Sequence, residues 1–164
     1  TGYQEIMTDP SYAGQIITFT FPHIGNTGTN TIDVETDTPA ALGMITRTTP
    51  TDPSSYRAMA HLSAWLTQNG IPGIGGIDTR ALTHHIRDNG EPKGVIATDP
   101  NGDFDRDALV KMAQDWPGLS GMDLAKGVTR AAGQDWAEST WSMVTDTYTT
   151  NADADLNVIA LDYG

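Results

Sequence analysis

The most suggestive residues for chemistry are Asp9-Pro10-Ser11-Tyr12, which combine a carboxylate and a hydroxyl around a turn-forming proline. A serine hydroxyl can donate and accept hydrogen bonds, so Ser11 is a candidate for positioning a polar ligand. Turn chemistry alone also explains the pattern, because Asp accepts from the backbone two residues later and Pro fixes φ. From these residues alone, an ordinary surface turn is the favoured interpretation.

Few other residues in the chain are candidates for catalysis. The sequence has no cysteine, which removes both disulfides and a thiolate nucleophile. A hydrolase that used Ser11 and His23 is recommended only by their spacing, since no oxyanion-hole motif accompanies them. On a helix, the adjacent His84 and His85 would point about 100° apart, so the sequence predicts no metal site. The glycine run at 73–76 fits no phosphate-binding motif and predicts a tight turn.

The elements that must position these residues follow from apolar periodicity and from turn residues. Strands are expected at 15–21, 42–47, within 71–77, at 93–98 and at 136–144. Helices are expected after the N-cap Asp52, over 79–88 behind the N-cap Asp78, and around Phe104, Ala108 and Met112. Residues 26–40 and 118–127 read as irregular, and 145–155 as a linker. The fold class is therefore α/β, in mixed order.

Composition and charge narrow the function classes. The chain has 164 residues, of which 38% are hydrophobic, and this fits one globular domain with a real core. Its formal charge of −12 repels phosphate backbones and anionic lipids, which disfavours a nucleic-acid or membrane-surface role. No apolar run approaches the roughly 20 residues that a membrane-spanning helix needs.

Longer stretches carry a more specific signal. They are TGYQEIMTDPSY at 1–12, FPHIGN at 21–26, GIDTR at 76–80, PGLSGMDLA at 117–125 and VIALDYG at 158–164. Together they resemble the N-terminal domain of the small, glutamine-hydrolysing subunit of carbamoyl-phosphate synthetase. The resemblance covers nearly the whole chain.

The resemblance implies a fold and a division into domains. The expected fold is a layered β/β/α domain of the swivelling type, with mixed sheets and incomplete at its start. This domain is expected at residues 1–145, followed by a linker at 146–156. Residues 157–164 are expected to be the first strand of a class I glutamine amidotransferase domain. Since that second domain carries the cysteine nucleophile in the family, the chain is expected to be a fragment.

The resemblance also implies a function. In the family the small subunit releases ammonia from glutamine, and the large subunit combines it with bicarbonate, using ATP and Mg, for arginine and pyrimidine biosynthesis. Ser11 would contact glutamine, and no residue of this chain would be catalytic. Thr1, Gly2, Tyr3 and Asp9 would lie near the large-subunit interface or the ammonia exit. The expected setting is a cytoplasmic heterodimer with the large subunit, with no cofactor in this chain itself.

One alternative function keeps the same fold. The chain could be a free-standing, non-catalytic binding or docking module. The final stretch VIALDYG argues against this, because it lies where the amidotransferase strand begins in the family. Under the family interpretation, residues 118–125 or residues 1–5 are expected to contribute to docking on the large subunit. A Gly-x-Cys-x-Gly nucleophile turn encoded after Gly164 would decide between the two.

Overall fold

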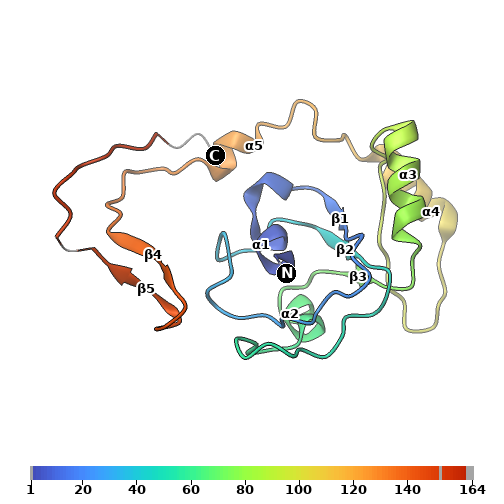
Figure 1. The fold of residues 1–164 in the computed structure, drawn as a ribbon. Helices are drawn as coiled ribbons and strands as arrows, with labels where there is room; N and C mark the ends of the chain where they lie inside the picture. Colours follow the sequence, from blue (N-terminus) through green and yellow to red (C-terminus); the bar gives the residue numbers. More distant parts are fainter. Residues whose placement is uncertain (1, 152, 162–164) are drawn as a thin grey trace. The chain divides into compact units, whose positions relative to one another are not determined.

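The computed structural model describes residues 2–151 and 153–161 (Figure 1). Thr1, residue 152 and residues 162–164 lie outside that description, so the predictions made for them are not addressed by the fold. The chain forms two compact units, Thr1–Met122 and Asp123–Gly164. In the described ranges, every helix is too short or too polar to cross a bilayer.

The first unit contains most of the regular structure. Its elements are α1 (Tyr3–Thr8), the 3-10 helix η1 (Pro10–Tyr12), β1 (Ile16–Thr18), β2 (Gly43–Ile45), α2 (Leu62–Gln68), β3 (Gly73–Ile74), α3 (Thr79–Asn89) and α4 (Arg106–Asp115). The second unit contains α5 (Leu124–Val128), β4 (Glu138–Ser142) and β5 (Thr147–Thr150). The strands predicted at 15–21, 42–47 and within 71–77 are therefore confirmed in the first unit, in shorter form.

A three-stranded parallel sheet organises the first unit, in the order β1-β2-β3 (Figure 1). Ile17 is paired with Met44, and Met44 with Gly73, so these residues share one face of the sheet. Parallel neighbours need long crossover connections, and the chain supplies them as the segments 19–42 and 46–72. The predicted α/β class is confirmed.

The core lies where α1 and α2 meet the face of the sheet that carries Met44. Leu66 covers this face closely, since a methyl group at Gly73 would lie 3.4 Å from Leu66 Cδ1. On the other face, a methyl group at Gly43 would lie 2.9 Å from Ile96 Cδ1, so the end of the Ile96 side chain covers β2 closely there. The buried apolar residues are Tyr3, Met7, Phe19, Ile24, Ala41, Met44, Leu62, Leu66 and Ile71.

The prediction that a helix starts at Asp52 is wrong. The helix begins only at Leu62, and His61 is its N-cap. The preceding backbone is used elsewhere, because the amide of Met59 donates to Thr29 O at 2.9 Å. These tertiary hydrogen bonds hold residues 51–60 against the loop 24–29, and a helix there would break them. Met59 is accordingly 71% exposed instead of lying on a buried stripe.

Two further expectations about the first unit need correction. Residues 93–98 form no strand, and Ile96 instead packs its side chain over β2. α4 is present, but Phe104 precedes it, and the half-buried residues are Leu109 and Ala113 instead of the predicted stripe. α3 follows the prediction closely, with Asp78 as N-cap and Gly90 at its end.

The second unit is built around an antiparallel pair of strands. β4 lies inside the strand predicted at 136–144, and it is paired with β5. β5 occupies part of the segment 145–155, which was expected to be structureless, so that expectation is wrong at this point. The stretch 118–127, also expected to be irregular, contains α5, capped by Asp123. Residues 157–161 form no strand, and the remainder of that predicted strand lies outside the described residues.

Candidate functional site

Helix α1 is held to the loop after β1 by two buried polar side chains. The Gln4 side-chain amide donates to Asn30 O at 2.6 Å and accepts from Asn30 N at 2.9 Å, as a paired strand would. The Tyr3 hydroxyl donates to Gly28 O at 2.7 Å and accepts from Thr27 Oγ1 at 2.8 Å. Tyr3 and Gln4 are only 1% and 3% exposed. These contacts fix the position and rotation of α1.

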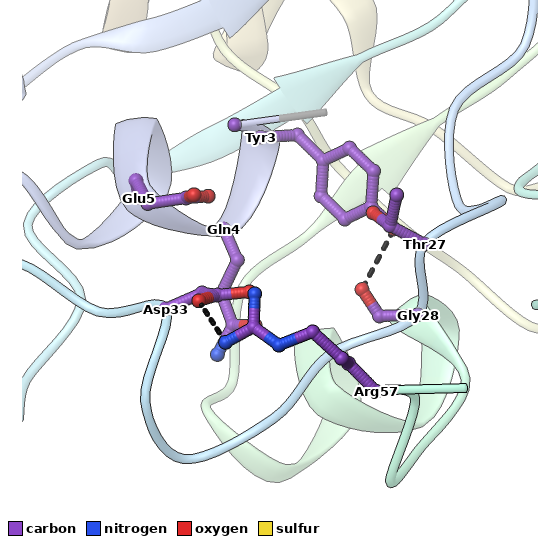
Figure 2. Close-up of a pocket in the computed structure, with 8 residues that line it drawn as sticks. Tyr3, Gln4, Glu5, Thr27, Gly28, Asp33 and Arg57 are labelled. Carbon is purple, nitrogen blue, oxygen red and sulfur yellow. Dashed lines mark hydrogen bonds and ion pairs between the residues drawn. The ribbon is translucent and has the colours of Figure 1, made fainter. Parts of the chain in front are cut away.

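A small pocket of about 140 Å³ lies beside the start of α1, and Figure 2 shows its lining. Arg57 and Asp33 form an ion pair at its edge, with Arg57 Nη2 and Asp33 Oδ1 2.8 Å apart. Burial raises the pKa of Tyr3, and its hydrogen bond from Thr27 partly offsets this, so the phenol is neutral at neutral pH. The lining residues are Gly2, Tyr3, Gln4, Glu5, Thr27, Gly28, Asp33 and Arg57.

The turn that carries Ser11 follows α1 directly. Asp9 is the N-cap of η1, and its Oδ1 accepts a hydrogen bond from Ser11 N at 2.8 Å. The predicted Asp turn is therefore present, and the carboxylate of Asp9 is used to hold it. Ser11 is exposed, and its hydroxyl makes no hydrogen bond to any residue that the structure describes. The arrangement is a hydrogen-bonded turn that presents an exposed hydroxyl.

The histidines form no catalytic or metal-binding group. His23, His84 and His85 are exposed. His61 has a structural role, since its Nδ1 accepts from Ser63 N at 3.1 Å at the start of α2. Across residues 2–151 and 153–161, no cluster of three or more His, Cys, Asp or Glu side chains is placed to hold a metal ion.

The comparison with protein families decides what this domain is. Residues 1–96 match the model of the carbamoyl-phosphate synthase small chain, CPSase domain. The chain belongs to this family. The similarity extends over its whole length, as the relatives of known name show.

The carbamoyl phosphate synthase small chain of Bradyrhizobium diazoefficiens is 54% identical over 168 residues, which cover 100% of this chain and 42% of that protein. The small chain of Rhizobium meliloti is 55% identical over 170 residues, with the same shares. The chain thus spans about two fifths of the length of these small chains.

The structure separates the family's expected site residues into two neighbouring groups. Gly2 and Tyr3 line the pocket at the start of α1, whereas Asp9 and Ser11 form the turn at its end. Thr1 lies outside the described residues. The assignments of Ser11 to glutamine and of the other four to an interface or ammonia exit stay predictions.

Other polar residues of the site were missed from sequence. The Asp33–Arg57 ion pair joins residues 24 positions apart, and no periodic pattern connects such residues in a sequence. α1 itself has six residues, too few for its apolar spacing to show. Of these residues, the sequence comes closest to indicating a role for Asn30, because a cluster of Asn, Thr and Gly predicts side-chain hydrogen bonds within a loop.

Proposed function

We propose that this chain is the N-terminal part of the small, glutamine-hydrolysing chain of a carbamoyl-phosphate synthase. The supporting observation is the 54% identity to a named small chain across all of this sequence. The parent enzyme would supply ammonia from glutamine for ATP-dependent carbamoyl-phosphate synthesis from bicarbonate. It would act in the cytoplasm, in arginine and pyrimidine biosynthesis, with ATP and Mg bound by the large chain.

Within that enzyme, this chain is a scaffold and docking surface with no catalytic residue of its own. A glutaminase of this type needs a thiolate nucleophile, and the sequence contains no cysteine. The purified 164-residue chain should therefore release no ammonia from glutamine. Ammonia release above a protein-free blank would contradict this role and would favour an independent hydrolase.

Ser11 is proposed to position glutamine instead of attacking it. Its exposed hydroxyl can donate to the substrate's carboxylate or accept from its amino group. Asp9 holds the turn through Ser11 N, so little conformational freedom is lost when a ligand binds. No histidine or carboxylate is hydrogen-bonded to the Ser11 hydroxyl among the described residues, which argues against nucleophilic use.

The test is Ser11→Ala in the parent small chain, assembled with the large chain. A hydrogen bond to a charged group contributes about 1.5–3 kcal/mol, so KM for glutamine should rise about ten- to a hundredfold. Synthesis from added ammonia bypasses glutamine and should continue at the original rate. Ser63→Ala, at an exposed position of α2, is the matched control and should change neither rate. Unchanged glutamine kinetics in Ser11→Ala would remove the assignment.

Docking on the large chain is proposed to use the surface around Gly2 and Tyr3 together with residues 118–125. A stable heterodimer interface buries at least about 1,200 Å² in total, and part of it should come from this chain. Hydrogen exchange of the assembled enzyme should show protection in one or both regions relative to the free small chain. A complex that forms without protection anywhere in residues 1–150 would contradict the docking role.

The finer fold assignment is also part of this proposal. We expect the parallel sheet to belong to a layered β/β/α domain of the swivelling type, with mixed sheets. β1 and β3 are the edge strands of this sheet, and exposed edges are places where further strands can pair. A structure of the parent small chain in which no strand is added beside β1 or β3 would refute the assignment.

A further inference from the structure

A distant segment of the chain packs against the exit of the Ser11 turn. Gly14 follows Ser11 by three positions and has a left-handed φ of +75°. A methyl group at Gly14 would lie 3.0 Å from Leu119 Cδ2 and 3.8 Å from Trp116 Cζ2. Leu119 therefore lies directly against the Gly14 backbone with Trp116 in ordinary contact range, and a side chain at this position would force Leu119 to shift.

The turn itself is continuous from Ser11 to the sheet. Ala13 N donates to Pro10 O at 3.0 Å, and Gln15 N donates to Tyr12 O at 3.1 Å. The Gln15 side chain also donates to Ser11 O at 3.1 Å. Residues 9–13 and Gln15 are joined by these hydrogen bonds, and Gly14 lies in the chain between them, so a shift at Gly14 would be passed to Ser11.

The segment that carries Trp116 and Leu119 has hydrogen bonds and packing of its own. Trp116 is the C-cap of α4, and its amide donates to Ala113 O at 3.3 Å. Gly118, between them, has a left-handed φ of +83°, and Leu119 and Trp116 both lie near Gly14. Trp116 is 36% exposed and Leu119 is half-buried, which fits side chains that cover a turn on one side. The residues that directly follow α4 therefore pack against one side of the turn.

We propose that Leu119 and Trp116 are positioning residues for the glutamine-binding turn. They hold the backbone at Gly14 and, through it, the direction of the Ser11 hydroxyl. The inference rests on the proposed role of Ser11 in glutamine binding. In this role Leu119 and Trp116 act through the backbone and do not touch the substrate. Position 14 requires glycine, because glycine adopts the left-handed φ without strain and leaves room for these side chains.

The test compares Leu119→Ala and Gly14→Ala in the assembled parent enzyme. Displacing a binding group by a fraction of an ångström should raise KM for glutamine about three- to tenfold in each variant. The rate from added ammonia should stay unchanged. Leu119→Val carries the same test if Leu119→Ala does not assemble.

The matched control is Gly102→Ala. Gly102 has the same φ of +75°, but a methyl group there meets nothing within 4 Å. It therefore carries the same backbone strain without the contact, and KM for glutamine should not change. The double variant Gly14→Ala/Leu119→Ala makes room for the methyl group, so its effect should be smaller than the product of the two single effects.

The outcomes separate this inference from the proposed function. If Ser11→Ala raises KM for glutamine but Leu119→Ala and Gly14→Ala do not, the positioning role is wrong and the role of Ser11 stands. If Ser11→Ala has no effect, the role of Ser11 fails and the inference fails with it. An equal rise in KM in Gly102→Ala, or an equal loss of the ammonia-dependent rate in Leu119→Ala, overturns the positioning role, because general destabilisation then explains the change.

Discussion

Tyr3→Phe tests the contacts that hold α1 in place. The change removes one hydroxyl, which donates to Gly28 O at 2.7 Å and accepts from Thr27 at 2.8 Å. Thr27 is half-buried and can turn toward water, but the Gly28 carbonyl is buried and would lose its partner. Leaving a buried polar group without a hydrogen bond costs about 1–3 kcal/mol. We therefore expect the free energy of unfolding to fall by that amount at neutral pH.

The same substitution has a pH dependence of known sign. Burial raises the pKa of Tyr3, so the folded chain holds the phenol proton more tightly than the unfolded chain does. The resulting stability is fully present below the unfolded pKa of about 10, and it is lost as pH rises through the raised folded pKa. Tyr3→Phe has no such group. The stability difference between the two proteins should therefore shrink as pH rises above about 10.

Urea unfolding followed by tryptophan fluorescence measures both effects. With an m value of about 2 kcal/mol/M, the midpoint should fall by roughly 0.5–1.5 M at neutral pH. The control is Tyr56→Phe, since Tyr56 is 76% exposed and its loss should change stability by less than about 0.5 kcal/mol. Equal midpoints for the two variants, or a difference that widens at alkaline pH, would refute the reasoning.

Three further substitutions test the packing by the same unfolding measurement. Gln4→Ala should cost about 1–3 kcal/mol, because both Asn30 backbone groups lose their partner; a loss no larger than that of the exposed Gln114→Ala would contradict this. Leu62→Ala should cost about 2–5 kcal/mol, since Leu62 is 0% exposed in the core; a neutral result would mean that α2 is not packed as described. Asp78→Ala should cost about 0.5–2 kcal/mol by removing the N-cap of α3; full stability would show that the cap contributes nothing.

Two aspartates show what could be predicted about the fold from sequence. Asp78 and Asp52 both carry the local pattern of a helix N-cap. At Asp78 the prediction is confirmed, because its carboxylate accepts from Ala81 N at 3.0 Å and the helix starts at Thr79. At Asp52 it is wrong, because four amides between residues 51 and 60 donate to carbonyls of the loop 24–29; they belong to Thr51, Ser54, Met59 and Ala60. A local pattern succeeds only where no distant segment claims the same hydrogen bonds.

In the candidate site, too, local contacts could be predicted from sequence and distant contacts could not. The hydrogen bond from Ser11 N to Asp9 spans two residues, and the Asp-Pro-Ser order predicts it. The packing of Leu119 on Gly14 joins residues more than a hundred positions apart, and no spacing rule in the sequence links them. The turn that carries Ser11 was therefore predictable from sequence, and the distant residues that pack against it were not.

Close backbone contacts explain why the site depends on loops as much as on helices. A methyl group at Gly28 would lie 2.5 Å from Ala58 Cβ, and one at Gly25 would lie 2.8 Å from Thr51 O. The loop 24–29 is thus pressed against residues 51–60, the segment that fails to become a helix. The same loop supplies Gly28 O to Tyr3. Residues 51–60 support the loop, the loop holds α1, and α1 leads into the turn of Ser11. Gly28→Ala should therefore also disturb the Ser11 turn, although position 28 lies outside it.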